Sequence, residues 1–410
     1  MFKLLPHQQE ALDETEQYHN VAYYYDMGLG KTFIGSERLW EMNTPYNLVI
    51  CQKSKVSDWY EHFRRYYPEY VVIKYDKQTR VPDHSILIVN YEKAWRRLFL
   101  NRLKDFTLML DESSKIKNDK SKQTKFILGL HPDNVILLSG TPTGGKYEEL
   151  WSQCKLLGWK IGKTAFLKRY TIQKWNPILS FYEIKGYQNT DELIAKLHQY
   201  GAVFKKTEEV LDLPKQNHIE IKCNSTGDYQ TFKRDHYLVR NDEPLIGDMP
   251  ITAKLILRKL AGAWNPNKLA ALNELMESTE DRLIIFYNFN IEVDELKKIC
   301  KKHHRPMSIV NGATKDLSAY ENKTNSVTLI QYQAGSMGLN LQKANKIVYF
   351  TLTDKSELFE QSKKRIHRIG QDKPCFYYYL LTTNSIEPRM LEVLKMRCDY
   401  TDKLFEKEGF

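Results

Sequence analysis

The sequence predicts an α/β protein with two tandem parallel-sheet lobes and a helical insertion between them. Three observations predict this class. Short apolar runs alternate with helix-like stretches over the first third of the chain, and the same alternation returns after Asn265. The region between has longer helical patterns and few glycines. Because strands of a parallel sheet are buried on both faces, they read as continuous apolar runs separated by helices.

The first lobe is expected to span residues 1–150. Its expected strands are residues 21–25, 47–51, 85–89, 107–110 and 135–138. Helix-like segments between them include residues 32–42 and 55–67. Alternation of this kind predicts a parallel sheet covered by helices on both faces.

The second lobe is expected to span residues 264–410. Its expected helices are residues 268–278 and 291–303, and its expected strands are residues 282–287, 307–310, 327–331 and 346–350. Residues 151–263 are predicted to be a helical elaboration of the first lobe and the connection to the second. Within them, residues 212–214 read as a break and residues 218–223 as a strand.

The composition favours a cytoplasmic, nucleic-acid-binding protein. The 410 residues exceed one ordinary domain, and 61 Lys and Arg against 51 Asp and Glu give a formal charge of +10. That charge favours a polyanionic partner, nucleic acid first, although a merely soluble basic protein has the same balance. Six scattered cysteines without a C-x-x-C pair suggest neither a zinc site nor a disulfide framework. We expect no signal peptide and no membrane span.

A candidate phosphate-binding loop lies near the start of the chain. Residues 26–32, Asp-Met-Gly-Leu-Gly-Lys-Thr, follow an expected strand and open an expected helix. Its glycines would let backbone N–H groups approach phosphates at the helix N-terminus. Lys31 would neutralise the β- and γ-phosphates and Thr32 would ligate Mg²⁺. The strict G-x-x-x-x-G-K-[ST] pattern has glycine where this chain has Tyr25, and Gly-Lys-Thr alone is also compatible with a helix cap.

Two adjacent carboxylates follow the expected strand 107–110. Asp111 and Glu112 would lie at the carboxyl edge of the sheet, beside the candidate loop. In such sites an Asp holds Mg²⁺ and a Glu polarises the attacking water. An acidic N-cap for the segment that begins with Ser113 and Ser114 is the alternative interpretation.

Residues 139–142, Ser-Gly-Thr-Pro, follow the expected strand 135–138. Small hydroxyl side chains at a strand end suit the sensing of a γ-phosphate. An ordinary turn uses the same residue types, so this motif alone indicates only a loop.

Two arginines near the end of the chain, Arg365 and Arg368, are spaced to lie on one helix face. An arginine delivered to a transferring phosphoryl group raises the rate by roughly 10³–10⁵. Lys363 and Lys364 precede the pair, so a solvated basic face is the alternative.

These elements, in this order, resemble superfamily 2 helicases, and specifically the Swi/Snf-like branch of DNA translocases. Residues 5–8 resemble the segment whose glutamine reads adenine, and residues 26–32 are close to D-E-M-G-L-G-K-T. Residues 111–118 resemble D-E-x-H-x-x-K-N with Ser114 in place of histidine. Residues 334–341 resemble A-G-G-x-G-x-N-L, and residues 361–371 match Q-x-x-x-R-x-x-R-x-G-Q with Lys364 in place of aspartate.

The resemblance implies two tandem RecA-like lobes with an ATP site in the cleft, ATP and Mg²⁺ as cofactors, and DNA as partner. It implies catalytic roles for Lys31, Asp111, Glu112, Gln361, Arg365 and Arg368. It implies nucleotide binding by Gln8, Met27, Gly28, Leu29, Gly30, Lys31, Thr32 and Gly338, with Thr32 and Asp111 on the metal. It implies DNA contacts by Lys53, Ser54, Lys55, Tyr91, Thr141, Lys146, Ser336 and Asn340.

The function implied by this branch is ATP-dependent translocation along duplex DNA, with hydrolysis coupled to closure of the lobes. The DNA contacts would be sequence-independent phosphate contacts. The chain looks most like compact bacterial or phage members, expected to be monomeric and cytoplasmic (in the host cell for a phage), with replication, recombination or repair proteins as candidate partners. Two alternatives remain. A strand-separating helicase would need a pin, which a hairpin within residues 151–263 could supply. A binding module with a decayed ATP site would have lost the residues that this chain retains.

Overall fold

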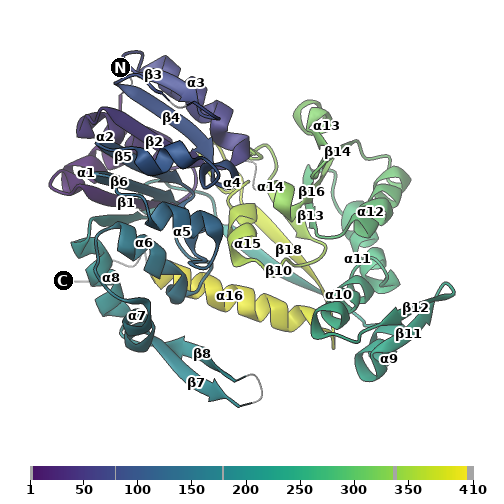
Figure 1. Cartoon of the computed structure of the whole chain (residues 1–410). Coiled ribbons are helices and arrows are strands. Elements are labelled where there is room, and N and C mark those ends of the chain that lie inside the picture. Colours follow the sequence, from purple (N-terminus) through teal and green to yellow (C-terminus); the bar gives the residue numbers. More distant parts are fainter. Residues whose placement is uncertain (1–2, 79, 178–179, 336–338, 404–410) are drawn as a thin grey trace. The chain divides into compact units, whose positions relative to one another are not determined.

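The computed structural model describes residues 3–78, 80–177, 180–335 and 339–403 (Figure 1). The chain divides into two units, each considered by itself: unit 1 is residues 1–211 with 399–410, and unit 2 is residues 212–398. Within the described residues each unit holds one seven-stranded, mostly parallel sheet, which confirms the predicted α/β class with two tandem lobes. The division after Leu211 falls inside the predicted insertion, so residues 212–263 group with unit 2.

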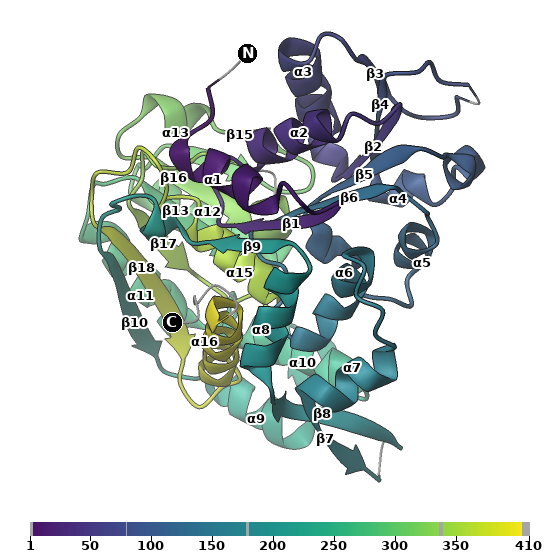
Figure 2. The same cartoon turned by 90° about the vertical axis from the view of Figure 1, so that its left-hand side faces the viewer.

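The sheet of unit 1 has the order β3-β4-β2-β5-β6-β1-β9, and all neighbouring strands are parallel. Its strands are β1 Asn20–Tyr25, β2 Tyr46–Cys51, β3 Val71–Lys74, β4 Ser85–Asn90, β5 Phe106–Asp111, β6 Asn134–Ser139 and β9 Ala202–Lys205. The five predicted strands are confirmed. The edge strands β3 and β9 were not predicted, because each has only four residues, and neither is buried throughout. Figure 2 shows β9 alongside β1.

Helices cover both faces of this sheet because successive strand side chains point to opposite faces. Val21, Tyr23 and Tyr25 of β1 belong to one core, whereas Ala22 and Tyr24 belong to the other. The first core packs against α1 Pro6–Thr15, α2 Lys31–Met42 and α3 Val56–Tyr66. The second packs against α4 Tyr91–Ala94, α5 Lys122–Leu128, α6 Trp151–Leu156, α7 Lys163–Tyr170 and α8 Thr190–Gln199.

The sheet of unit 2 has the order β10-β18-β17-β13-β16-β14-β15, with only the last pair antiparallel among the described strands. Its strands are β10 Gln216–Cys223, β13 Leu283–Tyr287, β14 Met307–Val310, β15 Lys315–Asp316, β16 Val327–Gln331, β17 Lys346–Tyr349 and β18 Cys375–Thr382. The strand predicted at residues 218–223 is therefore confirmed as β10, parallel to β18.

The unit 2 sheet also lies between helical layers. One core includes side chains of α11 Pro266–Glu277 and α12 Asn290–Lys302. The other includes side chains of α13 Ser318–Asn322, α14 Tyr332–Gly335, α15 Ser356–Lys363 and α16 Glu387–Lys403. A fully buried ion pair joins Lys268 on α11 to Glu387 at the start of α16, with Nζ 2.5 Å from Oε2. Breaking one partner of such a pair is costly, because the remaining charge stays buried.

The predicted helical insertion contains two β-hairpins besides its helices. In unit 1, β7 Thr171–Asn176 pairs antiparallel with β8 Phe181–Tyr187. In unit 2, β11 Tyr237–Arg240 pairs with β12 Glu243–Ile246 and packs near α9 Gly227–Asp235 and α10 Pro250–Ala261. No helix among the described residues is long and apolar enough to cross a membrane.

Candidate nucleotide-binding site

The candidate phosphate loop lies between β1, which ends at Tyr25, and α2, which begins at Lys31. Gly28 has φ +92° and Gly30 has φ +75°, a left-handed conformation that side chains with a Cβ rarely adopt. A Cβ on Gly30 would also lie 2.1 Å from Nε2 of Gln8. At Gly28 no atom lies within 4 Å of an ideal Cβ position, so the backbone there is open for approach.

The first residues of α1 fix one side of this loop. The Gln8 amide donates to the carbonyl of Leu29 at 3.3 Å, and the His7 ring lies 3.0 Å from the same oxygen. The Tyr25 hydroxyl donates to the carbonyl of His7 at 3.3 Å. Gln8 is thus adjacent to the phosphate loop, as its implied role in nucleotide binding requires, and Tyr25 acts as a buried anchor where the strict pattern has glycine.

Asp26 fixes the other side. Its Oδ2 accepts hydrogen bonds from both the backbone N–H and the hydroxyl of Thr207, each at 3.1 Å. Its own N–H donates to the carbonyl of Lys205, the last residue of β9, at 3.0 Å. The carboxylate of Asp26 therefore ties the loop to the chain that follows the edge strand.

Lys31 lies along the loop it follows. Its ammonium donates to the carbonyls of Tyr25 at 2.6 Å and of Asp26 at 3.0 Å. A Cβ on Gly140 would lie 3.3 Å from Nζ of Lys31 and 3.3 Å from Cγ of Met27. The Ser-Gly-Thr-Pro motif at the end of β6 therefore contacts the phosphate loop closely, and its glycine permits that approach. Thr32 is exposed at the first turn of α2.

Asp111 ends β5 at the same edge of the sheet. Its Oδ2 accepts a hydrogen bond from the Trp59 indole N–H at 2.9 Å. Burial raises the pKa of the Asp111 carboxyl, and the indole hydrogen bond together with the positive charge of Lys31 opposes that rise. The two loops thus bring an ammonium and a carboxylate into electrostatic contact, as a site for a phosphate with its metal ion requires.

Glu112 adopts a left-handed backbone with φ 58° and ψ 60°. Such a conformation costs on the order of 1–3 kcal/mol outside glycine and persists only where its surroundings impose it. The Tyr91 hydroxyl donates to the carbonyls of Asp111 at 2.9 Å and of Glu112 at 3.3 Å. Tyr91 is only 2% exposed. These contacts fix the backbone that carries both carboxylates.

Gln153 on α6 was not singled out by the sequence, yet it joins three parts of the site. Its Oε1 accepts from the hydroxyls of Tyr24 at 3.0 Å and Ser113 at 2.7 Å. Its Nε2 donates to the carbonyl of Pro142 at 2.7 Å. The side chain is fully buried and links β1, the residue after Glu112 and the Ser-Gly-Thr-Pro motif. A polar residue within an otherwise apolar helical face was the available signal.

In unit 2 the two arginines do not lie on a helix face, which corrects the prediction. Helix α15 ends at Lys363, and Arg365 and Arg368 occupy the turns that follow. Both Nη1 atoms lie 3.5 Å from the carbonyl of Leu339. Arg365 is 1% exposed, and burial lowers the pKa of the half-buried Arg368.

Gln371 holds the segment that contains the two arginines. Its amide donates to the carbonyls of Ile366 at 3.2 Å, Ala344 at 2.8 Å and Gln342 at 3.2 Å. Gln361 remains on α15 and is half-buried. Ser336 and Gly338 lie outside the described residues.

The residues expected to contact DNA fall into two groups. Lys53 and Ser54 are exposed and Lys55 is half-buried in the turn η1 Lys53–Lys55 after β2; Lys146 is half-buried and Asn340 exposed. Tyr91 and Thr141, in contrast, are 2% and 8% exposed. The Tyr91 hydroxyl is engaged by the Asp111 and Glu112 carbonyls, so its geometry favours a positioning role over a phosphate contact.

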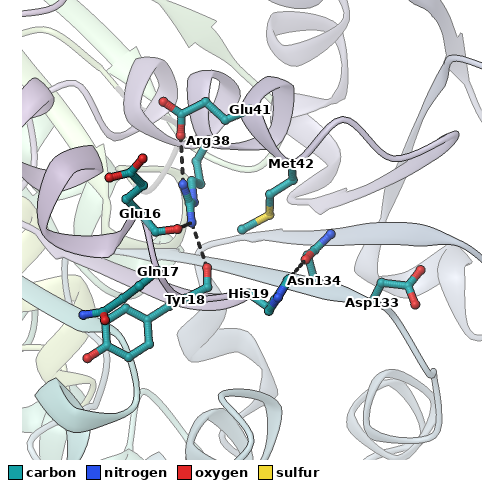
Figure 3. A pocket seen from close by; sticks show the side chains of 9 residues that line it. All are labelled: Glu16, Gln17, Tyr18, His19, Arg38, Glu41, Met42, Asp133 and Asn134. Atoms are coloured by element: carbon teal, nitrogen blue, oxygen red, sulfur yellow. Dashed lines mark hydrogen bonds and ion pairs between the residues drawn. The ribbon is translucent and has the colours of Figure 1, made fainter.

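A cavity of about 560 Å³ lies away from these loops (Figure 3). It is lined by Glu16–His19, which precede β1, and by Asn134, the first residue of β6, so it lies at the amino edge of the sheet. The Arg38 guanidinium donates there to the carbonyls of Glu16 at 3.0 Å and Tyr18 at 2.7 Å. This arginine therefore serves the fold, and the cavity is separate from the candidate nucleotide site.

Comparisons with known proteins find two overlapping family matches. The sequence profile of the SNF2-related domain matches residues 12–305, and that of the helicase conserved C-terminal domain matches residues 267–370.

Several curated relatives match at low identity over most of the chain. A mouse SWI/SNF-related matrix-associated actin-dependent regulator of chromatin, subfamily A member 1, is 24% identical over 91% of this chain and 40% of its own length. The yeast ISWI chromatin-remodeling complex ATPase ISW2 is 26% identical over 91% of this chain and 38% of its own length. The fruit-fly subfamily A-like protein 1 is 24% identical over 98% of this chain and 56% of its own length. The chain thus spans less than two thirds of each of these relatives.

A solved structure described as the Sulfolobus solfataricus SWI2/SNF2 ATPase core in complex with dsDNA aligns with 98% of this chain and 92% of its own. Its TM-score is 0.47 and its sequence identity is 19%.

Proposed function

Because the chain belongs to the family of SNF2-related domains, we propose that it is an ATP-driven motor that moves along duplex DNA. One observation in unit 1 carries the enzymatic half of this proposal. Lys31, Asp111 and Gly140 converge on a single edge of the sheet, from loops that follow three different parallel strands. The carboxyl edge of a parallel sheet is where such proteins bind their ligands.

The described residues fit a nucleoside triphosphate with Mg²⁺. The open backbone at Gly28 and the ammonium of Lys31 would hold phosphates, and the Thr32 hydroxyl and the Asp111 carboxylate would hold the metal. Gln8 lies against Leu29, beside the loop, where it can bind the base. When bound, Mg·ATP supplies the phosphoryl group whose transfer to water provides the energy.

Three residues would act on that transfer. The Glu112 carboxylate would orient and polarise water, and its fixed backbone keeps that side chain in place. Arg365 and Arg368 would stabilise the charge that develops on the phosphoryl oxygens. Closure of unit 2 over unit 1 would bring these arginines to the site, so hydrolysis would be coupled to opening and closing.

The DNA contacts proposed for unit 1 rest on the exposure of the side chains concerned and on the positive charge of the chain. Lys53 and Ser54 are exposed and Lys55 is half-buried, in the turn after β2, another parallel strand of the same sheet. The formal charge of +10 supports attraction of a polyanion. Contacts of this kind bind phosphates without reading sequence, and they weaken steeply with salt.

A strand-separating helicase is the second candidate. The specific observation that favours it is the β7–β8 hairpin, which lies within the region where the sequence analysis allowed for a pin. A decayed binding module is disfavoured, because the chain keeps Lys31, Asp111 and Glu112, and the charge of Lys31 acts on the Asp111 carboxyl at one edge of the sheet.

The test is ATP hydrolysis by the purified chain with no nucleic acid, blunt duplex DNA, single-stranded DNA or RNA at fixed low salt. A motor on duplex DNA is stimulated most by the duplex. Stimulation mainly by single strands would favour the helicase, and activity indifferent to all nucleic acids would overturn both.

The Lys31→Ala variant controls for contaminating ATPases and tests the phosphate loop. Loss of the ammonium that neutralises phosphate should lower turnover by roughly 10²–10³, while DNA affinity stays within a few-fold. Full activity in this variant would refute the loop assignment.

A further inference from the structure

The β7–β8 hairpin is a sheet of its own, outside the seven-stranded sheet of unit 1. Trp175 pairs with Tyr182, Asn176 with Phe181 and Lys174 with Glu183. Figure 1 shows the ribbon extending beyond α7, and Figure 2 shows the same from a perpendicular direction. An isolated two-stranded hairpin is at best marginally stable in water, so aromatic side chains exposed on it need a reason beyond the fold.

Three aromatic side chains near the end of this ribbon are open to solvent. Trp175 is 48% exposed, Phe181 49% and Tyr182 63%. The rings of Trp175 and Tyr182 pack edge to face, with centroids 5.1 Å apart. Because neighbouring pairs of a hairpin point to opposite faces, Trp175 and Tyr182 share one face and Phe181 lies on the other. The ribbon therefore presents aromatic surface on both faces.

The segment that contains α7 and the hairpin carries a net positive charge. Residues 160–187 contain six basic side chains and a single acidic one, Glu183. Ion pairs hold Lys163, Arg169 and Lys185, to Asp119, Glu192 and Glu183. The other three basic residues, Lys160, Lys168 and Lys174, are exposed. The excess of positive charge in this segment favours binding of a polyanion.

An exposed lysine beside exposed aromatic rings, as Lys174 is beside Trp175 on β7, is a combination that binds unpaired nucleic-acid bases. Rings stack on bases of any sequence, and lysines contact the backbone. A partner protein with a flat surface would cover one face of the hairpin. A hairpin that inserts among unpaired bases would instead contact them with the rings on both of its faces. The rings, rather than the charges alone, therefore identify the partner.

We propose that the β7–β8 hairpin binds unpaired bases of DNA, which stack on Trp175 and Tyr182 on one face and on Phe181 on the other, while Lys174 contacts the phosphates. The hairpin thereby recognises a fork or junction at the end of the duplex on which the motor moves. DNA as the partner rests on the proposed function; the surface itself rests on the exposed rings and the charge.

The test compares two DNAs and two matched variants by fluorescence anisotropy at fixed low salt. One DNA is a blunt duplex, and the other is the same duplex with two unpaired arms. The variant Trp175→Ala/Tyr182→Ala removes a cross-strand pair of rings. The control Tyr237→Ala/Ile246→Ala removes the cross-strand pair of the β11–β12 hairpin, with similar exposures of 49% and 53%.

Wild type should bind the fork more tightly than the blunt duplex. The Trp175→Ala/Tyr182→Ala variant should lose roughly tenfold or more for the fork and less than about twofold for the blunt duplex, since stacking acts only on unpaired bases. The control should keep wild-type affinity for both, and Trp175→Phe/Tyr182→Phe should restore most of the fork binding, because phenylalanine also stacks.

Unchanged fork affinity in Trp175→Ala/Tyr182→Ala would overturn the inference. So would an equal loss for both DNAs, which would reveal a phosphate contact or altered folding; the melting temperature distinguishes these two. Duplex-stimulated ATP hydrolysis is measured in parallel. Wild type that binds forks through the hairpin without duplex-stimulated hydrolysis would refute the proposed motor and keep the hairpin assignment.

Discussion

The phosphate loop of unit 1 and the arginine turn of unit 2 are held in different ways. Two residues outside the loop contact it: Gln8 donates to the Leu29 carbonyl, and Gly140 lies against Lys31 and Met27. Within the loop, Asp26 accepts a hydrogen bond from Thr207, which lies far away in sequence. In the turn, Arg365 and Arg368 each place Nη1 at 3.5 Å from the Leu339 carbonyl, the outer limit of a hydrogen bond. The comparison teaches that distant segments fix the loop of unit 1 through Gln8 and Thr207, whereas the Gln371 amide fixes the turn of unit 2 by donating to the carbonyls of Ile366, Ala344 and Gln342.

The largest expected effect sharpens this contrast. Arg368→Ala should lower kcat by roughly 10³–10⁵ and leave the dissociation constant for ATP nearly unchanged, because a guanidinium in the proposed role acts mainly in the transition state. Steady-state hydrolysis and equilibrium nucleotide binding measure the two effects. Arg389→Ala, at an exposed ion pair on α16, is the matched control.

If the only defect of Arg368→Ala were weaker DNA binding, the role in phosphoryl transfer would be wrong. Unit 1 would then bind the nucleotide and the arginine turn of unit 2 would bind DNA, instead of both acting on the nucleotide.

A second prediction tests whether unit 1 depends on its internal network. Gln153→Leu leaves the Tyr24 and Ser113 hydroxyls and the Pro142 carbonyl without this buried partner. The unfolding free energy should fall by roughly 1–3 kcal/mol. The rate of hydrolysis should fall as well, because Ser113 follows Glu112 directly. Urea unfolding and turnover provide the measurements.

Gln188→Leu is the control for that variant, since this exposed amide donates to the carbonyl of Lys168 at 3.1 Å. It should change stability by less than about 0.5 kcal/mol. Equal effects of the two substitutions would remove the distinction between a buried network and an ordinary surface contact.

The last prediction concerns a buried carboxyl, whose effect appears only as a dependence of stability on pH. Glu292 in unit 2 accepts from the N–H groups of Asn288 at 2.8 Å and Phe289 at 3.1 Å, yet burial raises its pKa to about 7. An exposed glutamate has a pKa of about 4.3. Between these values the folded protein holds a proton that the unfolded chain has released, so stability falls as pH rises from about 4 to 7 and loses nothing further above that range.

The free energy of unfolding, measured at several values between pH 5 and pH 8, tests the predicted fall in stability with rising pH. Glu292→Gln should remove a decline of roughly 1–3 kcal/mol with rising pH. A variant with the same pH profile as wild type would place the titrating group elsewhere.

The sequence predicted those parts of the fold whose signal is local. Strands such as β1 and β13 are continuous apolar runs, and the loop with Lys31 has its own motif. Hairpin β7–β8 was missed because its strands are exposed and have no buried run. Strand β18 carried a readable apolar signal at Cys375–Thr382 that was not used.

The sequence predicted which residue types form the candidate site, but it predicted their arrangement in space less well. Lys31 and Asp111 lie at the predicted edge, but the role of Gln153 depends on contacts with residues up to 129 positions away. The predicted helix through Arg365 and Arg368 was wrong: α15 ends at Lys363, and the segment that follows it makes long-range contacts such as that of the Gln371 amide with the Ala344 carbonyl. Spacing alone cannot reveal such competition between local and long-range hydrogen bonds.

The contact between Asp26 and Thr207 has a mechanical consequence. Thr207 lies a few residues before Asp212, where unit 2 begins. Tension on the connecting chain therefore reaches a carboxylate within the phosphate loop after crossing only a short segment of backbone. The candidate phosphate loop is therefore attached directly to the segment that leads into unit 2, so a shift of that segment would act on the conformation of the loop.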